Sequence, residues 1–155
     1  MNYSFTEWLD VIGKLIVVFG LPFGLYQYII TKRKEKRDRE YGTYDALDEK
    51  YIEFQKLCLD HPDLDVFDVP DKTPKQLNAK EKKEELILFT ILFSIFERAY
   101  ILYNDESSEI KEKQWTGWKH YIQSYCKRNN FMQAWKESGT TFDIRFQTFM
   151  SEVLP

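Results

Sequence analysis

The 155-residue sequence predicts an all-α protein: one N-terminal transmembrane helix followed by a cytoplasmic helical bundle. Three observations support this fold class. A nearly uncharged apolar run occupies residues 9–31, a basic cluster follows it directly, and the rest of the chain repeats its apolar residues at intervals of three and four. The mean hydropathy of −0.52 does not reveal this pattern, because it averages an apolar segment with a charged one.

The segment 9–31 is long and apolar enough to cross a bilayer. Its stretch 15–30 contains no charged residue, and a spanning helix needs about 20 mostly apolar residues at 1.5 Å each. Aromatic residues stand near both ends, where interfacial aromatic side chains occur: Trp8, Tyr26 and Tyr28. A buried or surface-lying amphipathic helix stays open as an alternative, because Asp10, Lys14, Pro22 and Gln27 dilute the run.

Six basic residues follow the apolar run directly: Lys32, Arg33, Lys34, Lys36, Arg37 and Arg39. By the positive-inside rule, such a cluster stays in the cytoplasm. We therefore expect residues 1–8 to form a short external N-terminus, residues 32–43 a basic juxtamembrane segment, and residues 44–155 a cytoplasmic bundle at the inner membrane of a bacterial cell. Anionic lipid headgroups are the expected partner of the cluster, at about 1 kcal/mol per basic residue, and nucleic acid is disfavoured.

Three glycines recur within the run: Gly13, Gly20 and Gly24. Gly20 and Gly24 form a GxxxG pair, and Gly13 precedes Gly20 by one heptad. Small residues at this spacing let two membrane helices approach closely. The pattern predicts helix association and a homo-oligomer; the alternative is that membrane helices simply tolerate glycine.

Residues 44–155 read as helices joined by turns. An apolar stripe predicts a helix to about residue 59: Tyr44, Leu47, Tyr51, Phe54, Leu57 and Cys58. This helix either continues from the apolar run or is interrupted at Gly42. The Asp- and Pro-rich segment 60–74 predicts a connection with turns. Further helices are expected at about 78–103, 108–128 and 131–136, and a last one is expected to begin after the N-capping segment 138–141 and to carry Phe142, Phe146, Phe149 and Val153.

A second membrane span at residues 86–103 is the main alternative to this topology, because this mostly apolar stretch of eighteen residues could just span a bilayer. Glu97 and Arg98 would then lie two-thirds of the way through, each costing about 2.5–3.5 kcal/mol. A core helix of the bundle explains the segment at lower cost. Glu97 and Arg98 are then expected to be a buried polar pair that fixes helix register; the alternative is a polar site facing a pore, a partner or a ligand.

The sequence contains no motif for catalysis or metal binding. The spacing of Cys58, His61, His120 and Cys126 does not favour a zinc site, so both cysteines are expected to be free and reduced. The aspartates of 60–71 do not fit the register of a calcium-binding loop. Neither histidine has an arginine at the distance that nucleases of the HEPN type need. We therefore expect a protein that is not an enzyme and that binds no cofactor.

The order of segments resembles a group of small bacterial single-pass membrane proteins of unknown function. The resemblance rests on EKYIEFQKLCLDHPDLDVFD, then ILFSIFERAYILY, then QWTGWKHYIQSYCKRNNFMQAWKESGTTFDIRFQTFM. Some proteins of this build accompany phage-defence systems, including CRISPR-associated RNA-targeting effectors. The resemblance implies a self-associating accessory protein of antiviral defence that forms a pore or perturbs the membrane. The alternative is a membrane-tethered adaptor whose bundle binds a soluble effector protein without pore activity.

Overall fold

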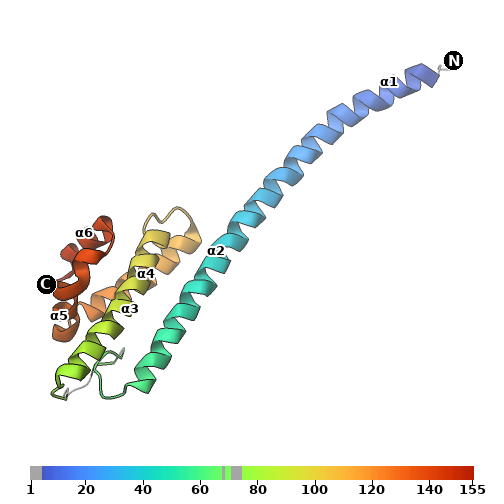
Figure 1. Cartoon of the computed structure of the whole chain (residues 1–155). Coiled ribbons are helices and arrows are strands. Elements are labelled where there is room, and N and C mark those ends of the chain that lie inside the picture. The colour runs from blue at the N-terminus through green and yellow to red at the C-terminus, as the bar shows by residue number, and fades with distance from the viewer. Residues whose placement is uncertain (1–4, 68, 71–74) are drawn as a thin grey trace. The chain divides into compact units, whose positions relative to one another are not determined.

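The structure is a computed structural model that describes residues 5–67, 69–70 and 75–155, and the described residues form helices and no strand (Figure 1). This confirms the predicted all-helical class. The helices are α1 (Phe5–Leu15), the π-helix η1 (Ile16–Gly20), α2 (Leu21–Asp60), α3 (Ala79–Tyr103), α4 (Glu109–Tyr125), α5 (Asn129–Ser138), the 3₁₀-helix η2 (Gly139–Thr141) and α6 (Ile144–Val153). The chain divides into two compact units, Met1–Gly42 and Thr43–Pro155. Of the predicted external segment 1–8, residues 1–4 lie outside the described residues.

Helix α2 is unbroken through the basic cluster and past Gly42. The sequence left open whether the helix of the apolar run is interrupted at this glycine. A single glycine inside a helix costs only about 1 kcal/mol relative to alanine, which the strong helix formers around it can offset. The charged residues 32–40 therefore lie on a regular α-helix, and their positions around its axis follow from their numbers.

The π-helix η1 ends at Gly20, two residues before Pro22. Proline has no backbone N–H, and its ring clashes with the carbonyl four residues earlier in an α-helix, which here belongs to Val18. Widening of the preceding turn relieves that clash, because a π-turn holds one residue more than an α-turn. The residue pattern around Pro22 does not predict this turn.

The second unit is organised around α3, which contacts α4, α5 and α6 (Figure 1). Its buried face repeats at intervals of three and four residues: Leu88, Phe89, Leu92, Phe93, Ile95, Phe96, Ala99 and Tyr103. Aromatic rings fill the space between the helices. Phe93 has its ring centroid 4.9 Å from that of Phe131 and 5.1 Å from that of Trp135, and Phe96 lies 5.6 Å from Tyr121. Residues 86–103 thus form the core helix of this unit.

By length and composition alone, both α3 and the N-terminal helix could cross a membrane. Their burial differs. In the most apolar window of α3, 44% of the residues are buried inside the structure, whereas none are buried in the corresponding window of the N-terminal helix. Only the N-terminal run therefore lacks a protein environment for its apolar side chains.

The predicted helix ends and core stripe are largely confirmed. Asn78 caps α3, accepting from the backbone N–H of Lys80 and Glu81, while the Glu81 carboxylate accepts from the Asn78 N–H in return. The stripe prediction is wrong for Leu57, which is exposed. The expected cap of the last helix is also wrong: residues 139–141 form η2, and the side chain of Asp143 caps α6.

Candidate functional site

The apolar side chains of the N-terminal run are exposed on every side of the helix. Four consecutive residues make this clear, because they cover a full turn: Ile16 is 64% exposed, Val17 57%, Val18 60% and Phe19 67%. A helix that is apolar all round belongs in a protein core or a membrane. The described residues provide no protein core around this run, and by length and composition it is a candidate for a membrane span.

The three glycines of the run are not equivalent. An ideal Cβ placed on Gly24 or Gly13 would meet nothing within 4 Å, and one on Gly20 would meet only the Ile16 side chain at 3.6 Å. Since the π-turn between them adds one residue, it rotates Gly13 by about 100° relative to the other two. Gly20 and Gly24 share a face, and Gly13 lies off it.

The basic cluster is exposed along its whole length. Lys32 pairs with Glu35 at 2.8 Å and lies over the Tyr28 ring, 5.8 Å from its centroid. The hydrogen bond and the charge of Lys32 lower the pKa of Glu35. Among the described residues, Arg33 and Arg37 have no ion pair or hydrogen bond, so their guanidinium groups are available to other molecules.

Glu97 and Arg98 do not form a buried polar pair. Glu97 is partly buried, and its Oε1 accepts from the backbone N–H of Asp143 at 2.5 Å, which satisfies an otherwise unpaired donor at the start of α6. Arg98 is exposed, which corrects the expectation that it is buried. Adjacent residues of a helix point about 100° apart, so only Glu97 faces α6.

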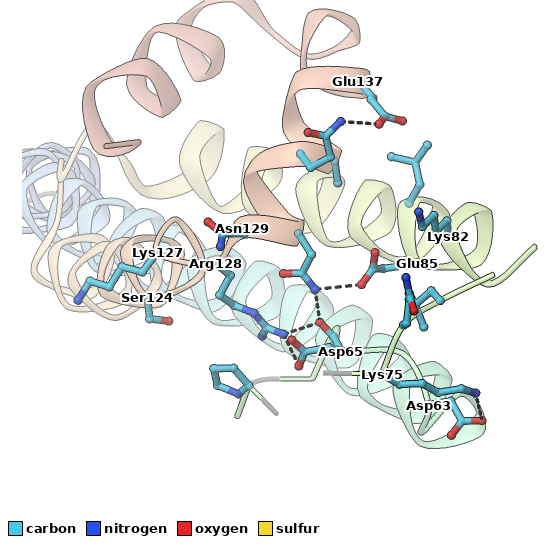
Figure 2. Close-up of a pocket in the computed structure, with 17 residues that line it drawn as sticks. Asp63, Asp65, Lys75, Lys82, Glu85, Ser124, Lys127, Arg128, Asn129 and Glu137 are labelled. Atoms are coloured by element: carbon cyan, nitrogen blue, oxygen red, sulfur yellow. Dashed lines mark hydrogen bonds and ion pairs between the residues drawn. The ribbon is translucent and has the colours of Figure 1, made fainter. Parts of the chain in front are cut away.

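A polar cleft of about 920 Å³ lies within the second unit, between the α2–α3 connection, the first half of α3, and α5 (Figure 2). Arg128 is buried in its wall, pairs with Asp65 at 2.8 Å, and donates to the carbonyl oxygens of Asp65 and Phe67. Asn130 bridges the Asp65 carbonyl at 2.7 Å and the Glu85 carboxylate at 2.9 Å. Burial raises the pKa of Glu85. This network fixes the connection to the start of α5.

The Arg128 network is not among the sites predicted from the sequence. A signal was present, because Arg128 stands between two apolar positions, Cys126 and Phe131, at a break between helices. An arginine in such surroundings needs acceptors, and the Asp-rich connection supplies them. The α2–α3 connection therefore forms turns and also supplies the acceptors of Arg128.

The residues weighed as metal ligands do not form a metal-binding group in the part of the chain that the structure describes. No group of three or more His, Cys, Asp or Glu residues there could hold a metal ion. Cys58 and Cys126 are both free and buried, and burial raises the pKa of the Cys126 thiol to about 12. A thiol in such an environment is a packing residue and not a nucleophile.

The chain matches no protein-family model, no curated protein and no solved structure. Its function therefore has to be inferred from its own residues.

Proposed function

We propose that this chain is a non-enzymatic, self-associating membrane protein, anchored by residues 9–31 with its bundle in the bacterial cytoplasm. The observation that supports the anchor is the exposure of apolar side chains around the whole circumference of the N-terminal helix. Each such side chain gains about 1.5–3 kcal/mol on full burial. The gain over the run is large enough to hold the protein in a bilayer.

The basic cluster supports the orientation. Residues 32–39 follow the apolar run on the same continuous helix. If the run spans a bilayer, they would lie beside the headgroups, where anionic lipids attract basic side chains. A reporter fused after Pro155 tests this topology. We expect it in the cytoplasm, and a reporter on the outside would mean that residues 86–103 form a second span. Resistance of the protein to extraction from membranes by alkaline carbonate tests the anchor itself.

Gly20 and Gly24 support self-association. A Cβ added at Gly24 meets nothing within 4 Å, and one at Gly20 makes only an ordinary contact of 3.6 Å with Ile16, so we expect substitution to leave the single helix intact and to affect contacts between copies. The test is to measure the size of the protein in mild detergent. We expect an oligomer that Gly20→Ile and Gly24→Ile convert to smaller species, while Gly13→Ile, on a different face, has little effect. A monomer at every accessible concentration contradicts the proposal.

The proposed activity is perturbation of the membrane, as an accessory protein in phage defence. It rests on the resemblance of this chain to small membrane proteins that accompany CRISPR-associated effectors, together with the exposed span. Leakage of ions on overproduction tests it, and we expect Gly20→Ile to abolish the leakage while Gly13→Ile retains it.

A membrane-tethered adaptor is the second candidate, and the polar cleft beside Arg128 is the observation that favours it. Such a cleft, in a bundle held at the membrane, suits contact with a soluble partner. Absence of leakage from an oligomeric, membrane-inserted protein would favour the adaptor over the pore.

A further inference from the structure

Three tyrosine hydroxyls form a hydrogen-bonded chain inside the second unit. Gln55 of α2 donates to the Tyr51 hydroxyl at 2.6 Å, and the Tyr51 hydroxyl bonds to that of Tyr121 on α4. The Tyr121 hydroxyl donates to that of Tyr125 at 3.4 Å, and the Tyr125 hydroxyl donates to the Val66 carbonyl at 3.1 Å. The tyrosine chain thus begins on α2, passes along one turn of α4 and ends on the α2–α3 connection.

The two ends of the tyrosine chain determine its direction. An amide N–H can only donate and a backbone carbonyl oxygen can only accept, so each hydroxyl between Gln55 and Val66 accepts one hydrogen bond of the chain and donates the next. The Tyr51 hydroxyl is therefore the donor to Tyr121. Hydrogen bonds that follow one another in this way polarise and strengthen each other, so the loss of one hydroxyl weakens the bonds beyond it.

The rings of the same three tyrosines are also in contact. The ring centroids of Tyr51 and Tyr121 lie 5.4 Å apart with the rings at 87°, and those of Tyr121 and Tyr125 lie 5.1 Å apart at 73°. Edge-to-face contacts of this kind are favourable beyond the area that they bury. They supplement the long hydrogen bond between Tyr121 and Tyr125 and keep the tyrosine chain continuous from α2 to the end of α4.

Tyr125 joins the tyrosine chain to the wall of the polar cleft. The guanidinium carbon of Arg128 lies 5.0 Å from the centroid of the Tyr125 ring. Arg128 holds Asp65 and the carbonyl of Phe67, while Tyr125 holds the carbonyl of Val66, the buried residue between them (Figure 2). Two side chains in contact with each other therefore fix three consecutive residues of the α2–α3 connection.

We propose that the tyrosine chain couples the polar cleft to α2, so that a molecule which displaces the connection at the cleft also changes the hydrogen bonding of α2 at Tyr51. Because α2 continues without a break from the apolar run, the bundle can pass an event at the cleft to the helix proposed as the anchor. This role rests on the proposed anchor and on the adaptor function. The coupling itself belongs to the bundle and is tested without a partner.

A double-mutant cycle of unfolding in urea, with the full chain in mild detergent, tests the coupling. Tyr51→Phe removes only the hydroxyl at the α2 end, and Arg128→Met releases the connection at the other end. If the tyrosine chain joins the two ends, the hydroxyl of Tyr51 matters less once the connection is released. We expect the effect of Tyr51→Phe on the unfolding equilibrium constant to be at least threefold smaller in the Arg128→Met background. A smaller difference overturns the proposal.

Tyr103→Phe is the matched control for this cycle. Tyr103 is a buried tyrosine whose hydroxyl has no hydrogen-bond partner among the described residues. Its removal should therefore have the same effect, within twofold, in both backgrounds. A background dependence as large as that of Tyr51→Phe would mean that any buried hydroxyl responds to Arg128, which contradicts a specific chain.

Hydrogen exchange provides a second measurement that does not require the Arg128 variant to fold. The amides of Leu64 and Val66 donate to the carbonyls of His61 and Leu64, at 3.1 and 2.9 Å, and report on the connection. Relative to the amides of α6, we expect Tyr51→Phe to lower their protection at least fivefold and Tyr103→Phe to leave it within twofold. Unchanged protection in Tyr51→Phe contradicts the coupling. A chain that is monomeric or causes no leakage refutes the proposed function and not the coupling.

Discussion

Replacing Arg128 by methionine should be among the most destabilising single changes in the bundle. The side chain of Arg128 is 7% exposed and that of its partner Asp65 is 15% exposed. The substitution leaves the mostly buried Asp65 carboxylate without the Arg128 cation and removes the arginine donor from the Phe67 carbonyl, while the Asp65 carbonyl keeps the Asn130 donor. Breaking a buried ion pair by removing one partner costs about 3–5 kcal/mol, a large part of the stability of a typical domain.

The assay is urea unfolding of the full chain in mild detergent, followed by tryptophan fluorescence. Lys50→Met is the matched control, because it breaks an exposed ion pair with Glu53 of the same 2.8 Å length, and we expect no measurable change. Arg128→Met with Asp65→Leu removes both charges and should recover part of the loss. If Arg128→Met lowers the free energy of unfolding by less than about 1 kcal/mol, the buried network contributes far less to stability than a buried ion pair should.

Three further predictions follow from packing and burial. Gly139→Ala should destabilise the bundle by about 1–3 kcal/mol in the urea assay, because the added Cβ would lie 2.7 Å from the Trp135 ring. Gly117→Ala is its control: an added Cβ there meets nothing within 4 Å, so this change should stabilise the bundle by up to about 1 kcal/mol. Phe93→Ala should cost about 3–5 kcal/mol, measured the same way, because Phe93 is fully buried among four aromatic rings. Burial raises the pKa of Cys126 from 9.0 to about 12. As the pH rises, the unfolded chain therefore loses the thiol proton before the folded chain does, and the free energy of unfolding should fall between pH 9 and 12. Cys126→Val should reduce that fall.

The local patterns of this sequence predict its helices well. The helix expected at 78–103 is α3 at Ala79–Tyr103, and the one expected at 108–128 is α4 at Glu109–Tyr125. Both predictions succeed because the apolar period and the capping residues Asn78 and Ser108 are encoded within a few residues of each helix.

The features that sequence reasoning missed depend on contacts or on competing backbone effects. Arg128 pairs with Asp65, 63 positions earlier in the sequence, and donates to backbone carbonyls of the α2–α3 connection. The periodicity of apolar residues does not predict a contact of this kind. The π-turn depends on how the helix adjusts to Pro22, which a residue pattern does not specify. The prediction that Arg98 is buried is wrong because its neighbours in the sequence are strongly apolar and indicate burial on all sides, although α3 has one solvent-exposed stripe.

The π-turn before Pro22 has a consequence for the backbone of the membrane segment. In an α-helix the N–H of residue 22 would bond to the Val18 carbonyl, and in a π-turn to the Val17 carbonyl, but proline supplies no N–H. Proline thus removes one backbone donor from the middle of the apolar run. In hydrocarbon an unsatisfied carbonyl oxygen costs several kcal/mol, and a local π adjustment is one of the ways in which such an oxygen finds another donor. The π-turn therefore lets the apolar run contain a proline and stay helical on both sides of it.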